Sequence, residues 1–235
     1  MRYCLFILSI ITFFSCKKGT FDAGNTVIKE RVIANVHQII LYDNINLILT
    51  QDTVEKLRIE AGENIQNEIA TDINGAALTI KNTSSNQWLQ YPAQKINCYV
   101  SIKQLRKIDY KSAGNITSTN TLQSDYFQID SEGAGDVRLS LNSIKIVANA
   151  YQENADLILS GRSDTCYAYC SSRGTIDFRN LQVRRMAVDF GSVRDGYVWA
   201  TEALHAQIFY KGNLYYKGTP TVDMQLLHDG RLFRF

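Results

Sequence analysis

The chain has 235 residues, of which 45% are hydrophobic, and its formal net charge is +2. This hydrophobic content excludes an intrinsically disordered protein, and a total of two prolines excludes a proline-rich linker protein. Nucleic-acid binding needs a clear basic excess, so we expect no nucleic acid among the partners. The length suits one or two globular domains.

Residues 1–15 have the pattern of a secretory signal peptide. A short basic start precedes about a dozen apolar residues, too few to span a bilayer as a helix. The run FFSC at 13–16 resembles a bacterial lipobox, which implies a lipid on Cys16 and hence a membrane partner. The alternative is an ordinary signal peptide, or a short anchor, with a chance cysteine. We expect residues 16–26 to be the lipidated cysteine with a polar tether, and residues 27–235 to form a single domain.

Residues 27–105 are rich in predicted strands but irregular. Apolar and polar residues alternate in stretches that begin at Ile45, Leu57, Leu78 and Ile96. Asn74-Gly75 predicts a tight turn before the third of them. We expect this part to continue the regular region described next or to cap it, because an uncovered rung leaves a bare sheet edge.

Residues 106–235 repeat an alternating triplet about every 20 residues. The middle positions of five triplets are 129, 148, 168, 188 and 208, and Val137, Leu157 and Ile176 repeat with the same period. Gly, Asn and Asp separate the repeats and tolerate the backbone angles of sharp corners. Two short strands per repeat, stacked in register, predict an all-β fold, a β-solenoid with rungs of about 20 residues and a strand-rich N-terminal cap.

The cysteines of the predicted domain do not form a disulfide framework, which would be even and dense. They are Cys98, Cys166 and Cys170. On one extended strand Cys166 and Cys170 lie about 13 Å apart, whereas a disulfide needs Cα atoms within about 7 Å. Half a metal site is the other reading, but no histidine lies nearby in the sequence. We favour buried free thiols and expect neither a metal nor a cofactor.

The order and spacing of these segments resemble one known family. The segments are INLILTQ at 45–51, LRIEA at 57–61, NGAALTI at 74–80, VSIKQLRKI at 100–108, SAGNI at 112–116, GAGDV at 133–137 and YKGTP at 216–220. Together they resemble the auto-transporter adhesin family with the head GIN domain, a domain of unknown function in Bacteroidetes lipoproteins. The resemblance covers about residues 32–233. It implies a β-solenoid and a cell-envelope location, and it supplies no catalytic residue.

A β-solenoid can be a polysaccharide-cleaving enzyme, so we tested the carboxylates. Asp130 and Asp189 fall three rungs apart, about 14 Å, which is too far for the pair of a glycosidase. Asp136 and Asp156 fall on adjacent rungs, but they occupy the repeated corner where Asn115 also falls. Short Asx side chains at such corners bind the turn backbone, so we interpret Asn115, Asp136 and Asp156 as structural. A calcium site at these corners is the alternative, although the nonapeptide typical of calcium-binding repeats is absent.

Aromatic and basic residues give the better indication of a binding surface. The alternation points Tyr167, Tyr169 and Phe209 outward, and Arg184 and Arg185 flank the same rungs. Exposed aromatic patches mark binding surfaces, and sugar rings stack on them. The alternatives are aromatic residues packed against loops or the C-terminal tail, and solvated turn charges.

We therefore predict a lipid-anchored, non-catalytic binding module of the cell envelope, whose partner is a glycan or an envelope protein. It is secreted across the inner membrane to the outer membrane. Lys17-Lys18-Gly19 lacks the acidic cluster that resembles surface-export signals, which slightly favours the periplasmic face. The alternatives are a structural envelope protein without a specific ligand and a carbohydrate-active enzyme.

Overall fold

The computed structural model describes residues 23–84, 95–151 and 153–235. Over these residues all regular structure is β-strand. The strands are β1 (Thr26–Arg31), β2 (Gln38–Asp43), β3 (Ile45–Gln51), β4 (Lys56–Gly62), β5 (Ile69–Asn74), β6 (Ala77–Asn82), β7 (Ile96–Ile102), β8 (Lys107–Ser112), β9 (Ile116–Ser131), β10 (Val137–Tyr151), β11 (Leu157–Ser171), β12 (Ile176–Phe190), β13 (Gly196–Ile208), β14 (Leu214–Lys217), β15 (Thr221–Leu226) and β16 (Leu232–Arg234). Within this part of the chain no helix has the length and hydropathy of a membrane span.

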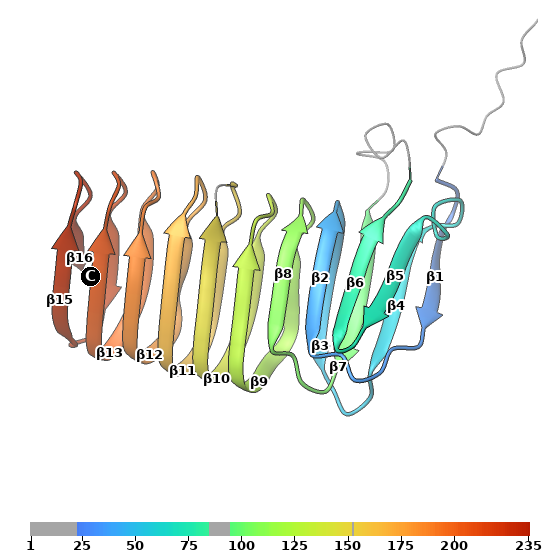
Figure 1. Ribbon diagram of the computed structural model, residues 1–235, viewed down its shortest axis with the longest axis horizontal. Coiled ribbons are helices and arrows are strands. Elements are labelled where there is room, and N and C mark those ends of the chain that lie inside the picture. Colours follow the sequence, from blue (N-terminus) through green and yellow to red (C-terminus); the bar gives the residue numbers. More distant parts are fainter. Residues whose placement is uncertain (1–22, 85–94, 152) are drawn as a thin grey trace, which may run out of the picture.

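The strands stack into a long two-layered β-solenoid, as the period of 20 predicts (Figure 1). The front sheet, nearest the viewer in Figure 1, runs in the order β5, β6, β2, β8, the second halves of β9–β13, and β15. The back sheet runs in the order β1, β4, β7, β3, the first halves of β9–β13, β14 and β16. From β3 and β2 to the last rung every pair is parallel, because each rung turns once and returns in register.

The two short strands predicted for each rung are one continuous strand in β9–β13. Each of these strands runs along the back sheet, bends, and continues along the front sheet (Figure 1). Register shifts mark the bends, between Arg138 and Ser140 and between Ile158 and Ser160, for example. An extra residue in one strand of a pair bends that strand, so the backbone changes direction without leaving the ladder.

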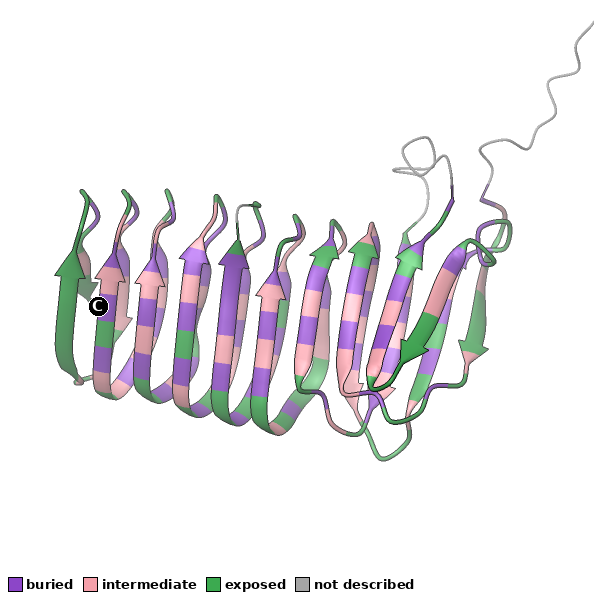
Figure 2. Cartoon of the chain, viewed as in Figure 1, coloured by how far each residue is buried: buried purple, intermediate pink, exposed green. Residues whose placement is uncertain are grey.

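Alternation along the strands places one side of each sheet in a shared core. One row across the front sheet contains Ile129, Ala148, Ala168, Val188 and Ala206, all fully buried. Buried and exposed residues alternate along the strands (Figure 2). The core is therefore a column of stacked apolar rows between the two sheets.

The row just described corrects one prediction. The expected row ended at Ile208, but Val188 pairs with Ala206, and Ile208 pairs with Phe190. The reason lies in the bend, where the offset between paired residues falls from 20 (Asp177 and Tyr197) to 17 (Gln182 and Trp199), then settles at 18. The last rungs are thus shorter, and outward Asp189 pairs with Gln207 instead of Phe209.

Residues 27–105 both continue the solenoid and cap it. β2 and β3 pair in parallel with β8 and β9 and form a rung of the stack. Beyond them, β1, β4 and β5 pair antiparallel with their neighbours. The predicted turn at Asn74-Gly75 joins β5 to β6, and Gly75 has a φ of 60°. Gln66, fully buried, closes this end of the core by donating to the carbonyls of Val27 and Ile59, both at 2.9 Å.

Candidate functional site

The corner that precedes the back-sheet half of each rung carries a column of polar side chains. Asn115 accepts a hydrogen bond from the backbone N–H of Asp136 at 2.9 Å, and its own N–H donates to Asn46 at 2.8 Å. Asp156 accepts in the same way from the N–H of Thr175 at 3.1 Å. Each of these side chains therefore ties one rung to the next through the backbone.

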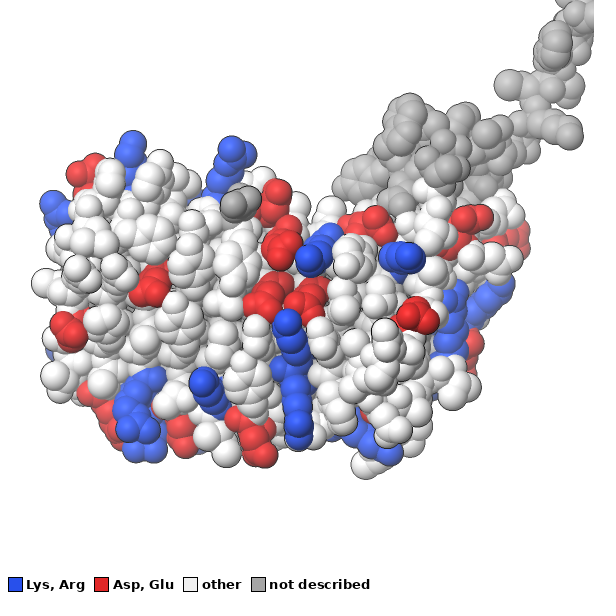
Figure 3. Space-filling view, in the orientation of Figure 1, with Lys and Arg blue, Asp and Glu red and all other residues white. Residues whose placement is uncertain are grey.

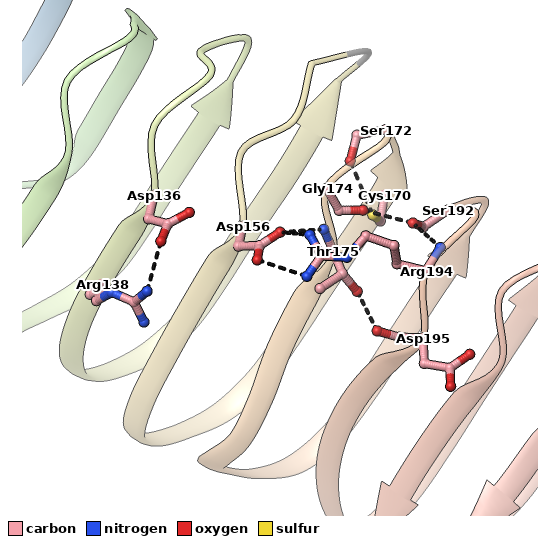
Figure 4. A network of polar contacts seen from close by, with 10 residues as sticks. All are labelled: Asp136, Arg138, Asp156, Cys170, Ser172, Gly174, Thr175, Ser192, Arg194 and Asp195. Carbon is pink, nitrogen blue, oxygen red and sulfur yellow. Dashed lines mark hydrogen bonds and ion pairs between the residues drawn. The ribbon is translucent and has the colours of Figure 1, made fainter.

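Asp136 departs from this pattern and binds an arginine (Figure 4). Its carboxylate pairs with Arg138, two residues further along, at 2.7 Å. Asp156 also holds Arg194, with Nη2 at 3.1 Å from Oδ2. Both carboxylates are thus engaged with cations at an open corner, and an exposed ion pair of this kind contributes at most about 1 kcal/mol.

Asp130 and Asp189, two of the outward carboxylates of the front sheet, do not converge, whereas Asp109 pairs with Asp130 across the ladder and shares Lys107 with it. Asp130 binds Asn149 at 2.7 Å and Lys107 at 3.2 Å. Asp189 accepts from the hydroxyl of Tyr167 at 2.6 Å. Over the residues that the structure describes, no group of three or more His, Cys, Asp or Glu side chains has the arrangement of a metal site.

Aromatic rings gather on the outward side of the front sheet. Tyr169 lies between two other rings, with centroids 5.6 Å from Tyr151 and 6.1 Å from Phe209, and it stacks on Phe209 at 25°. A period of 20 would place Phe209 beside Asp189, but Gln207 occupies that position and Phe209 follows two residues later. Phe209 still reaches Tyr169, because Gly191, which has no side chain, lies beneath its ring. We call Tyr151, Tyr169 and Phe209 together the aromatic platform.

Polar groups border the aromatic platform. Asn149 precedes Tyr151 by two residues and pairs with Tyr169 across the ladder, and Asp189 lies on the other side of Tyr169. Tyr167 is 38% exposed, and its hydroxyl is fixed by Asp189. In Figure 3 the acidic side chains of this face gather over β8 and β9, and the part over β10–β13 is mostly uncharged. The platform is thus an apolar surface with hydrogen-bonding groups at its border.

The two arginines flanking these rungs separate in the structure. Arg185 lies on the front sheet and pairs with Thr165, two residues before the row of Tyr167. Arg184 points into the bend instead, where Glu202 accepts from its Nε at 2.8 Å and Asp164 lies at 3.7 Å. Only Arg185 shares the front sheet with the tyrosines.

Two further features lie elsewhere on the surface of the solenoid. A polar groove of about 680 Å³ follows the bends of β9–β13 and is lined by Asn142, Arg162 and Gln182, among others. On the back sheet, Tyr197, Tyr215 and Phe233 stack with centroids 5.2 and 5.4 Å apart. The groove depends on where the strands bend, which the alternation of the sequence does not mark.

The described cysteines are free and buried, as predicted. Burial raises the pKa of Cys98 and Cys166 to about 12 and that of Cys170 to about 11, from 9.0. Cys166 and Cys170 face the core from one strand, on either side of Ala168. These thiols therefore pack as small apolar side chains. Cys16, the predicted lipidation site, lies outside the described residues.

These pKa values predict a loss of stability at alkaline pH. In the unfolded chain the thiols ionise above about pH 9, while in the folded chain they stay protonated until about pH 11 to 12. The free energy of unfolding should therefore be unaffected by the thiols below pH 9. It should fall above pH 9, by about 1.4 kcal/mol per pH unit for each thiol.

Urea titrations at pH 8, 9, 10 and 11 measure this fall in the free energy of unfolding, and a Cys166→Ala variant should show a shallower fall. Equal stability at pH 8 and 11 would contradict the assignment.

Fold and surface together define a parallel β-solenoid with an outward aromatic surface and capped at one end by antiparallel strands. The chain belongs to the family described as "Putative auto-transporter adhesin, head GIN domain", which matches residues 35–220. This confirms the family that the sequence resembles. The description of the family and of its solved relatives as adhesins indicates an adhesin-like binding module of the cell envelope.

Three solved structures share the fold. A "putative adhesin" from Bacteroides fragilis superposes with a TM-score of 0.80 at 22% identity, over 90% of this chain and 97% of the other. A "putative adhesin" from Parabacteroides distasonis has a TM-score of 0.66 at 17% identity, over 90% and 98%. A "putative lipid binding protein" from Parabacteroides distasonis has a TM-score of 0.67 at 17% identity, over 90% and 97%. No curated protein sequence matches this chain.

Proposed function

We propose that this protein is a lipid-anchored, non-catalytic module of the cell envelope that binds a glycan on the aromatic platform. The observation that carries the proposal is the arrangement of Tyr169 between Tyr151 and Phe209, bordered by Asn149 and Asp189. A sugar ring has an apolar face that stacks on an aromatic ring and hydroxyl groups that exchange hydrogen bonds with carboxylates and amides. The platform offers both, with Tyr151 and Tyr169 on the parallel strands β10 and β11 and Phe209 directly after β13.

The family supports the binding part of this proposal. Its members are named as adhesins, and a solenoid presents a long regular surface that suits an extended partner. The carboxylates near the platform support a binding role over hydrolysis. Asp130 and its neighbour Asp109 are bridged by Lys107, and Asp189 holds the hydroxyl of Tyr167. A glycosidase needs two carboxylates that converge on one bond.

Replacing the central ring tests the platform. The purified protein is screened against immobilised host and microbial glycans, and the dissociation constant of any bound glycan is measured by calorimetry. We expect Tyr169→Ala to weaken binding at least tenfold, which is about 1.4 kcal/mol, because the ring that a sugar covers is lost. Tyr169→Phe should bind nearly as well as the original protein, since it keeps the ring.

A ring on the opposite sheet is the matched control. Tyr215→Ala removes a stacked tyrosine from the back sheet and should leave glycan binding unchanged. Equal affinity in the Tyr169→Ala and Tyr215→Ala variants would exclude the platform as the site. Absence of binding to every glycan would favour the alternative of a structural envelope protein.

The proposed anchor is the lipid on Cys16, and the proposed location is the outer membrane with the solenoid facing the periplasm. In cells, Cys16→Ser should release the protein from the membrane fraction into the soluble fraction. Protease added to intact cells, with lysed cells as control, distinguishes the two faces of the outer membrane. Digestion on intact cells would overturn the periplasmic assignment and place the aromatic platform outside the cell.

A further inference from the structure

The β15–β16 end of the solenoid leaves apolar core positions uncovered. Val222, Met224 and Leu226 of β15 pair with Leu204, Ala206 and Ile208, which are inward and buried. The same inward positions on β15 are 36%, 55% and 39% exposed. Figure 2 shows β15 exposed along its whole length. The last row of the core is therefore open to solvent on one side.

Two unpaired strand edges border this apolar surface. Among the residues that the structure describes, β15 pairs only with β13, and β16 pairs only with β14. An unpaired edge presents a row of N–H and C=O groups that can accept another strand, and natural edges are usually blocked by lysine, proline or a bulge. β15 contains none of these, and its one charged residue, Asp223, lies 2.9 Å from His205 on the outward side. β16 contains one charged residue, Arg234, at its C-terminal end.

The other end of the stack differs in its back-sheet edge and in its core. Its front-sheet edge strand, β5, contains a single charged residue, Asp72, as β15 contains Asp223. Its back-sheet edge strand, β1, contains Lys29, Glu30 and Arg31, and charged side chains discourage edge pairing. Its core is closed by buried Ile65 and Gln66. The core at this end is thus covered, whereas the last core row at the β15–β16 end is open to solvent.

We propose that the β15–β16 end is a homodimer interface, at which a second copy of this chain docks end to end about a two-fold axis. A single added peptide strand would cover only one of the two edges. A second solenoid end would pair with both edges and cover the open apolar row at the same time. β15 runs into the turn at 228–231 and β16 leaves it, so the two strands run in opposite directions, one on each sheet. A two-fold axis normal to the sheets sets each of them antiparallel to its own copy.

The side chains are self-complementary in this arrangement. With Met224 on the axis, Val222 lies opposite Leu226 of the partner subunit, so inward apolar residues meet inward apolar residues. Asp223 lies opposite a neutral amide, Gln225 of the partner subunit. On the back sheet the residue beside the axis is Phe233, so the row of Tyr197, Tyr215 and Phe233 continues into the second copy. No charged side chain faces its own copy across the axis.

The oligomeric state of the purified full chain tests the proposal. Sedimentation and light scattering across a concentration series should show a dimer at micromolar concentration. Met224→Lys places a charge on the axis beside its own copy and should weaken the dimer at least a hundredfold. Ile144→Lys is the matched control, because Ile144 is 56% exposed at the bend, far from this end, against 55% for Met224. Since both side chains are exposed, both variants should fold.

Cross-linking tests the register independently. Met224→Cys should form an intermolecular disulfide under mild oxidation, since the two residues face each other across the axis. Gln225→Cys should not, because each copy of residue 225 lies opposite residue 223. A monomer at every concentration would overturn the proposal, as would a dimer that Met224→Lys leaves intact. Of the native thiols, Cys98, Cys166 and Cys170 are buried and should not interfere, and Cys4 and Cys16 are replaced by serine in both cross-linking variants.

Discussion

Gly161→Ala should lower the free energy of unfolding by about 3 kcal/mol or more, the largest loss we expect from adding one methyl group. Gly161 lies at the bend of β11 and pairs with Leu141 of the rung before it. Its φ is 110°, which other residues rarely adopt, and a Cβ there would collide with the backbone carbonyl of Leu141. Backbone strain of this kind costs about 1–3 kcal/mol, and overpacking adds about 1–3 kcal/mol.

The glycine of the β5–β6 turn separates these two effects. Gly75 has a φ of 60°, and a Cβ there meets no atom within 4 Å. Gly75→Ala should therefore lose only the conformational part, about 1–2 kcal/mol. Urea unfolding followed by circular dichroism measures both variants. If the two variants lose the same stability, the close approach of the rungs at Gly161 contributes nothing, and our account of the bend is wrong.

Phe190→Ala should destabilise the solenoid by about 3–5 kcal/mol. Phe190 is fully buried in a core row between Cys170 and Ile208, and its ring also covers Gly196. The truncation leaves a cavity. The rungs on both sides cannot move together to close it, because they are held in place by the hydrogen bonds between parallel strands. Thermal and urea unfolding of the purified variant give the loss of stability.

An exposed phenylalanine provides the control for Phe190. Phe235 is 53% exposed and touches Tyr197 edge-on, with centroids 5.9 Å apart. Phe235→Ala should cost less than about 1 kcal/mol. A loss at Phe190 as small as the loss at Phe235 would mean that the core row is loosely packed, contrary to the burial seen in the structure.

The period of the sequence predicts most of the fold because the side-chain alternation of a strand and the pairing of parallel rungs are both local. Rows such as Ile129, Ala148, Ala168 and Val188 follow directly from it. The prediction fails at Ile208, where two residues fewer in the bend of β13 move the row to Ala206. A bend can gain or lose residues without changing the alternation on either side of it, so its length is not visible in the pattern.

Part of the candidate surface was also predictable, because the outward positions on a strand follow from its side-chain alternation. Alternation places Tyr167 and Tyr169 outward, and the ladder keeps them on one sheet. It does not show that Arg184 turns into the groove, because Arg184 lies in the bend where alternation stops. Nor does it show that Phe209 leans over Gly191 to reach Tyr169, since that contact depends on an absent side chain one rung away.

The sequence by itself determined the fold class, the rung length over most of the chain, the family and the burial of the thiols. These properties depend on which residues alternate and on the spacing at which they repeat, and both can be read directly from the sequence. Only the tertiary structure decided that Asp136 binds Arg138 and leaves the column of corner hydrogen bonds, and that the rings of Tyr151, Tyr169 and Phe209 form one surface. It alone also showed the open apolar row at β15. These features depend on distances between rungs, which are set by bends, bulges and glycines that bring separate turns of the chain together.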